Sequence, residues 1–110
     1  MMHEFSKVLT FVSDPGHGWL EVPLTDIAAL GIEGQISPYS YLNGRFAYPS
    51  AVLRTGLEED CDYAVYMDAL AARGLPRPEI RQRYVEYFDR GQPGFGDRQF
   101  SPEFWDKLRR

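Results

Sequence analysis

A turn flanked by two β-prone runs, near the start of the chain, limits the folds that the remaining sequence can adopt. Residues 5–12 (FSKVLTFV) are rich in β-branched and aromatic side chains, and residues 19–22 (WLEV) resume that pattern. Such side chains suit a half-buried strand. Between the two runs, Pro15 fixes one backbone angle, and a glycine on each side of His17 permits a tight reversal. The stretch predicts a β-hairpin with His17 projecting from its loop close to Trp19.

A second hairpin is predicted further along the chain. Residues 36–42 (ISPYSYL) and 45–48 (RFAY) are separated by an Asn-Gly pair. Asn-Gly between alternating apolar residues is the strongest short-range signal for a β-hairpin. Because successive side chains on a strand alternate between its faces, Tyr39 and Tyr41 should point to the same side.

Three segments have helical patterns, and one segment is ambiguous. Residues 23–32 predict a short helix, and residues 63–73 carry an apolar stripe at helical spacing. Residues 101–108 begin with Ser-Pro-Glu, which is typical of a helix start. Residues 79–88 fit either a helix or a strand, and we favour a strand because their second half is strongly β-prone.

Together these elements predict an α+β fold for a single domain spanning residues 1–110. A chain of this length can bury one core but not two. We expect a small antiparallel sheet built from two β-hairpins, with a further strand over residues 83–88. The helix over residues 63–73 should pack on one face of this sheet, and a short C-terminal helix should dock beside it.

The charge of the chain restricts its partners. Sixteen acidic and twelve basic side chains give a net charge of −4, which argues against direct binding to nucleic acid or to an anionic membrane. Residues 1–75 hold ten acidic and four basic side chains, whereas residues 76–110 hold six and eight. The basic tail therefore either folds back onto the acidic part or meets a different partner.

The single Cys61 cannot form an internal disulfide, which favours a reducing compartment. The start of the chain lacks the pattern of a signal peptide. No apolar stretch reaches the roughly 18 residues that cross a bilayer. We expect a cytoplasmic protein without a membrane segment.

An acidic run at residues 58–62 (EEDCD) surrounds the cysteine. Neighbouring carboxylates raise the pKa of a thiol and oppose the thiolate that a nucleophile needs, so we expect Cys61 to be packed and inert. Asp60 or Asp62 can cap the helix that follows. Alternatively, the acidic run offers a surface for a basic partner.

Three motifs in order resemble a family of small, largely uncharacterised proteins of phages, plasmids and bacterial genomes. The motifs are DPGHGWLEV at 14–22, ISPYSY at 36–41 and LEEDCD at 57–62. This chain departs from the family pattern by placing residues 49–56 before the acidic run, and its C-terminal third has no match. The resemblance implies that the gene belongs to a mobile element, and that the protein acts in the host cytoplasm if a phage carries the gene. It does not assign a catalytic reaction to the protein. Small acidic proteins from such settings are often inhibitors of host defence, including anti-CRISPR proteins.

A metal-dependent hydrolase is the alternative. Asp-Pro-Gly-His-Gly after an apolar strand is similar to the opening of zinc-dependent N-acetylmuramoyl-alanine amidases, which implies that His17 is a metal ligand. A catalytic zinc site takes three protein ligands, and the only other histidine is His3. We therefore expect no catalytic residues, no metal and no cofactor.

The chain instead carries aromatic side chains grouped with turns, and these can anchor a protein interface. Acidic side chains nearby can pair with Lys or Arg on a partner. We expect a non-enzymatic protein-binding module that inhibits a host defence complex, with a host protein as partner, such as a nucleic-acid-binding defence component. The expected partner-binding residues are His17, Trp19, Tyr39, Tyr41, Glu58, Glu59, Asp60 and Asp62.

Overall fold

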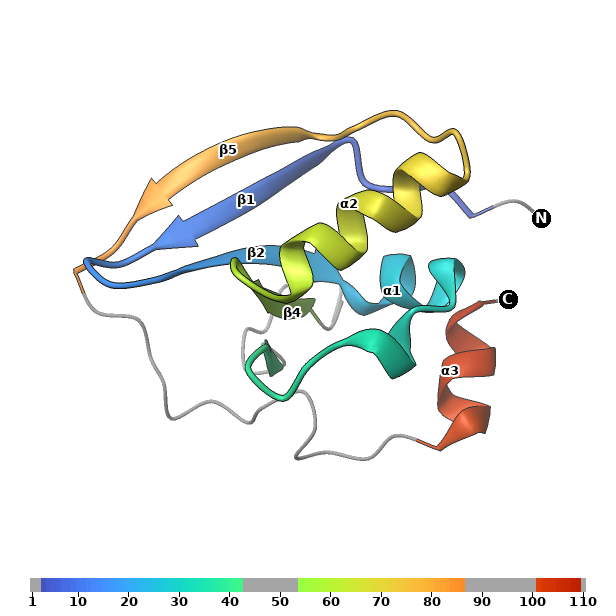
Figure 1. The fold of residues 1–110 in the computed structure, drawn as a ribbon. Helices are drawn as coiled ribbons and strands as arrows, with labels where there is room; N and C mark the ends of the chain where they lie inside the picture. The colour runs from blue at the N-terminus through green and yellow to red at the C-terminus, as the bar shows by residue number, and fades with distance from the viewer. Residues whose placement is uncertain (1–2, 43–53, 87–100, 110) are drawn as a thin grey trace, which may run out of the picture.

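The computed structural model describes residues 3–42, 54–86 and 101–109, and its architecture is α+β, as predicted (Figure 1). A sheet lies beside helices that are interspersed with the strands along the chain. In chain order the elements are β1 (Val8–Ser13), β2 (Gly18–Pro23), α1 (Leu24–Leu30), the 3-10 helix η1 (Glu33–Gln35), β3 (Tyr41–Leu42), β4 (Arg54–Glu58), α2 (Asp62–Ala72), β5 (Glu79–Tyr84) and α3 (Pro102–Leu108).

The five described strands form one mixed sheet in the order β3-β4-β2-β1-β5. β1 runs antiparallel to β2, with Val12 opposite Trp19, and β2 runs antiparallel to β4. β5 runs parallel to β1, with Ile80 beside Leu9, and the two arrows point the same way in Figure 1. The prediction of a purely antiparallel sheet is therefore wrong.

The helix between the last two described strands explains this difference. A tight turn forces the next strand to run antiparallel, whereas a helical crossover lets two strands run the same way. β4, α2 and β5 form such a crossover, and the chain re-enters the sheet where the Glu79 N–H donates to the Lys7 carbonyl over 2.8 Å. The last described strand consequently occupies Glu79–Tyr84 and begins four residues before the strand predicted over residues 83–88.

The second predicted hairpin is described only in part. β3 pairs antiparallel with β4, but the Asn-Gly turn and the strand predicted at 45–48 lie outside the described residues. The strand predicted over residues 36–42 is reduced to its last two residues. Two serines of this segment hydrogen-bond to the carboxylate of Asp62, which holds residues 37–40 in a turn.

α1 and α2 cover one face of the sheet, and the core lies between these layers. Leu20, Val22 and Leu57 of the sheet are fully buried there, together with Ile27 of α1 and Tyr66 of α2. Burial of an apolar side chain of this size contributes about 1.5–3 kcal/mol. The helix over residues 63–73 was thus correctly predicted to pack on one face of the sheet.

α3 docks against α1 and brings the basic tail back to the acidic part of the chain. Ser101 caps α3 as predicted, and Trp105 is buried. Arg109 donates from Nε to the Ala28 carbonyl over 2.7 Å and also pairs with Glu33. The sequence left open whether the basic tail folds back onto the acidic part or meets a different partner. Arg109 of the tail folds back, since it contacts Ala28 and Glu33.

Candidate functional site

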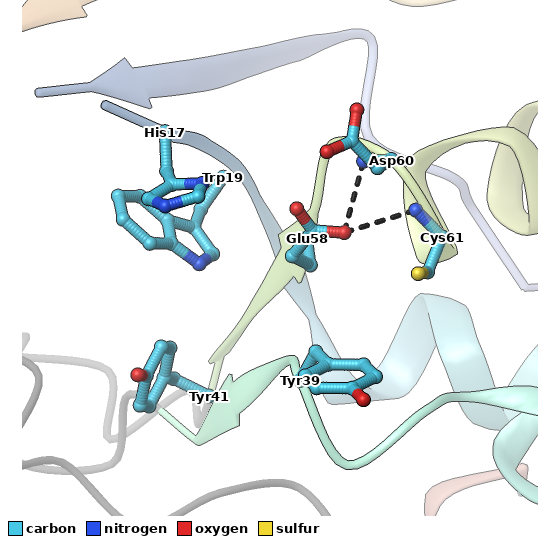
Figure 2. A pocket seen from close by; sticks show the side chains of 7 residues that line it. All are labelled: His17, Trp19, Tyr39, Tyr41, Glu58, Asp60 and Cys61. Carbon is cyan, nitrogen blue, oxygen red and sulfur yellow. Dashed lines mark hydrogen bonds between the residues drawn. The ribbon is translucent and has the colours of Figure 1, made fainter. Parts of the chain in front are cut away.

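Seven described residues surround a hollow of about 310 Å³ at the end of the sheet where β2 begins and β4 ends. Figure 2 shows their side chains arranged around this space. They come from the β1–β2 turn, from β2, from the segment leading into β3, from β3 and β4, and from the β4–α2 turn. We call it the aromatic hollow, and its residues are His17, Trp19, Tyr39, Tyr41, Glu58, Asp60 and Cys61.

The β1–β2 turn presents His17 at the hollow because Asp14 closes the turn. Asp14 Oδ1 accepts hydrogen bonds from the N–H groups of Gly16 and His17, at 2.9 and 2.8 Å. The Asp14 N–H donates to the His17 carbonyl over 2.9 Å. An aspartate that bonds to the backbone two and three residues ahead stabilises a turn without help from the rest of the fold.

Three aromatic rings form a row across the sheet. The His17 and Trp19 ring centroids are 6.0 Å apart, and those of Trp19 and Tyr41 are 6.1 Å apart, edge to face. Strand register explains the second contact, because Gly56 lies opposite Tyr41 and has no side chain to separate the rings. A Cβ on Gly56 would sit 3.4 Å from the Trp19 Cβ. Trp19 is only 3% exposed and forms the floor of the hollow, whereas His17 is exposed.

Carboxylates lie on the side of the hollow opposite His17 and Trp19 (Figure 2). Glu58 Oε2 accepts hydrogen bonds from the N–H groups of Asp60 and Cys61, at 2.9 and 3.0 Å. The Glu58 side chain is therefore fixed by the backbone of the β4–α2 turn. A carboxylate offers about four acceptor positions, so this anchoring leaves Glu58 able to accept from a ligand.

Asp62 positions the tyrosine side of the hollow, although it does not line the hollow itself. It is 1% exposed, and its carboxylate accepts from the Ser37 N–H at 3.0 Å, from Ser37 Oγ at 2.6 Å and from Ser40 Oγ. Ser40 Oγ also accepts from the Glu58 N–H over 3.0 Å. These bonds join the segment that carries Tyr39 to the start of α2 and the end of β4.

The predicted capping of α2 by Asp60 or Asp62 is wrong. Cys61 occupies the N-cap position, and no side chain makes a capping hydrogen bond there. Asp62 is the first residue of α2 itself, and its carboxylate is directed to the two serines.

Cys61 is exposed at the hollow, so the prediction of a packed cysteine is also wrong. Desolvation, a hydrogen bond with Glu58 and the charges of the neighbouring carboxylates all raise the pKa of the Cys61 thiol. This direction agrees with the sequence argument, and it opposes the thiolate form on which nucleophilic chemistry depends.

The structure brings six of the eight expected partner-binding residues to the aromatic hollow. The two others lie apart from it. Glu59 lines a second hollow of about 280 Å³ with Phe11, Tyr63, Ile80 and Gln82, and Asp62 is buried beneath Ser37 and Ser40. Sequence reasoning missed Cys61 as a lining residue and missed the two serines as supports. The Ser-Pro-Tyr-Ser spacing was the available signal for the serines, since short hydroxyl side chains favour turns.

In the described part of the chain, no group of three or more His, Cys, Asp and Glu side chains could hold a metal ion. None of the described helices has the length and apolar character needed to cross a membrane. Comparisons with protein-family models, with curated proteins and with solved structures found no match to this chain.

Proposed function

We propose that this chain is a non-enzymatic protein-binding module and that the aromatic hollow contacts its partner. The observation that supports this proposal most is the convergence of four ring side chains and two carboxylates, from six separate parts of the chain, on one hollow. Aromatic side chains are enriched at the centres of protein interfaces and dominate their binding energy.

The site is held in place before any partner arrives. Asp14 closes the turn that carries His17, and Asp62 fixes the segment that carries Tyr39. Glu58 is held by two backbone N–H groups. Preorganised side chains lose less conformational freedom on association, which strengthens binding.

The charge around the hollow favours a basic partner. Glu58 and Asp60 lie at the hollow, and Glu59 is exposed close by. Complementary charge mainly accelerates association and selects among partners. Basic grooves are typical of proteins that bind nucleic acid, so such a protein is a suitable target for this surface.

The setting of this function is part of the proposal. The three-motif resemblance to proteins of phages, plasmids and bacterial genomes favours a mobile-element origin and a role in the host cytoplasm. We infer that the partner is a host protein, such as a nucleic-acid-binding component of a defence complex, and that binding inhibits it in the manner of an anti-CRISPR protein. Among the described residues, no group of side chains around His17 could hold a metal ion, so these residues add no support to the alternative of a metal-dependent hydrolase.

Affinity capture from a host lysate tests the proposal with a matched pair of tyrosine variants. Tyr39 at the hollow is 68% exposed and Tyr84 on β5 is 62% exposed, so neither substitution disturbs the core. The wild type and Tyr84→Ala should capture the same protein, whereas Tyr39→Ala should lose most of it, because truncation of an aromatic anchor costs about 2 kcal/mol or more. Equal capture by all three forms, or capture of no protein by the wild type, would remove the support for this site.

A further inference from the structure

We propose that the aromatic hollow receives an arginine side chain of the partner protein, an inference that rests on the proposed function above. The hollow has two kinds of wall, aromatic rings and carboxylates, and arginine is the side chain that suits both. Its guanidinium stacks on aromatic faces and donates in a planar fork to carboxylates.

The ring geometry meets the first requirement. His17, Trp19 and Tyr41 form a row with neighbouring centroids about 6 Å apart, and Tyr39 lies across the space from them in Figure 2. A cation interacts favourably with a ring when it lies within about 6 Å of the ring centroid. The apolar stem of an arginine can also lie along ring surfaces while its charged head reaches the carboxylates.

The carboxylates meet the second requirement, because no described residue provides their positive counterpart. In the described residues, five other acidic side chains have basic partners: Asp26 with His3, Glu21 with Arg83, Glu33 and Asp106 with Arg109, and Glu79 with Arg81. Neither Glu58 nor Asp60 makes such a pair with a described residue, and none of the described lining residues is Lys or Arg. A cation from outside the chain would complete the charge pattern of the hollow.

Arginine fits better than lysine because rings and carboxylates lie side by side in the hollow. The carboxylates and the rings line the same space. A flat guanidinium can bond to carboxylates at its edge while its face remains against a ring, whereas an ammonium is a compact, strongly hydrated charge. The expected order of affinity is therefore arginine first, lysine second, and neutral citrulline last.

NMR titration of the full chain with single-residue probes tests this order. The probes are the Nα-acetyl amides of arginine, lysine, trimethyl-lysine and citrulline. Arginine should shift the Trp19 indole N–H signal and the backbone signals of Tyr41 and Cys61, and citrulline should not, because it lacks the charge. Tighter binding of lysine or trimethyl-lysine than of arginine would overturn the inference, as would shifts located away from the hollow.

A pair of charge variants makes the titration specific to the hollow. Glu58→Gln keeps an oxygen that can accept from the Asp60 and Cys61 N–H groups but removes the charge, so the fold should be retained. It should weaken arginine binding by about tenfold, since hydrogen bonds to charged groups contribute more than neutral ones. Glu86→Gln, which changes an exposed carboxylate outside the hollow, should leave the affinity unchanged. Equal effects of the two variants would contradict the inference.

The titration separates failure of this inference from failure of the proposed function. If arginine does not bind but lysate capture still depends on Tyr39, the partner occupies the hollow without a guanidinium and the inference alone fails. If arginine binds and the lysate provides no partner, the hollow recognises a guanidinium, but the proposed function fails and the inference of a partner's arginine fails with it. Absence of both signals overturns both.

Discussion

Asp62 shows how one buried residue can organise a surface site. Its carboxylate accepts three hydrogen bonds from Ser37 and Ser40, so the segment leading to Tyr39 depends on an acid that never reaches the hollow. A buried hydrogen bond adds only a small net amount to the free energy of unfolding. Removing its acceptor lowers that free energy by more, because the remaining buried donors are left unsatisfied.

We predict that Asp62→Ala lowers the free energy of unfolding by about 3 kcal/mol, since buried hydroxyl and N–H donors would lose their acceptor. Asp60→Ala changes an exposed side chain two residues away and should alter stability by no more than about 0.5 kcal/mol. Urea unfolding followed by circular dichroism measures both variants. Similar losses of unfolding free energy in the two variants would show that Asp62 does not support the segment that carries Tyr39.

The difference between these two aspartates also marks the limit of prediction at the residue scale. The exposure of His17 and its closeness to Trp19 followed from local turn chemistry. The role of Asp62 did not, because it depends on serines more than twenty residues away in sequence. A run of acidic residues looks uniform in the sequence, but the fold buries one member and leaves its neighbours exposed.

At the scale of the elements, α1 and α2 meet through a buried polar contact. The Tyr66 hydroxyl of α2 lies 3.3 Å from Asp26 Oδ2 of α1, and both side chains are buried. Burial, and then the negative charge and hydrogen bond of Asp26, raise the pKa of Tyr66. The folded state therefore retains the tyrosine proton at a pH where the unfolded chain has released it.

This contact predicts a loss of stability at alkaline pH. A raised pKa in the folded state gives a contribution that is fully present below the pKa of an unfolded tyrosine, about 10, and is lost as the pH rises above that value. Tyr66→Phe should flatten this part of the stability curve relative to the wild type, whereas Tyr84→Phe, at an exposed position, should not. Urea unfolding between neutral and alkaline pH makes the comparison, and parallel curves for the wild type and Tyr66→Phe would contradict it.

The elements themselves were largely predictable, whereas their arrangement was not. Ser101 and the Pro after it identified the start of α3, and helical spacing identified α2, because both signals are local. The direction of β5 depends on its pairing with β1, about seventy residues earlier in the chain. The strand favoured within residues 79–88 is confirmed by β5, although it begins at Glu79 and not at Arg83. β-prone residues within a strand do not specify whether its neighbour runs parallel or antiparallel, so the parallel pairing could not be predicted.

At the scale of the whole molecule, the two faces of the sheet have different roles. One face is covered by α1 and α2 and carries the core. Trp19, Tyr41 and Glu58 alternate with core residues along the strands and so reach the opposite face. The core thus fixes the strand register, and the register in turn sets which side chains meet at the hollow.

Cys61 allows the central claim, that a partner covers the aromatic hollow, to be measured directly. It is the single cysteine of the chain and lines the hollow. Its alkylation rate can therefore be followed by mass spectrometry, at alkaline pH because the pKa of its thiol is raised. The reference is a Cys61→Ser, Asp68→Cys variant, which moves the thiol to an exposed position on α2 outside the hollow. Saturation with the captured partner should slow alkylation at position 61 several-fold and leave position 68 unaffected. Unchanged alkylation of Cys61 in the saturated complex, or equal protection at both positions, would contradict the claim.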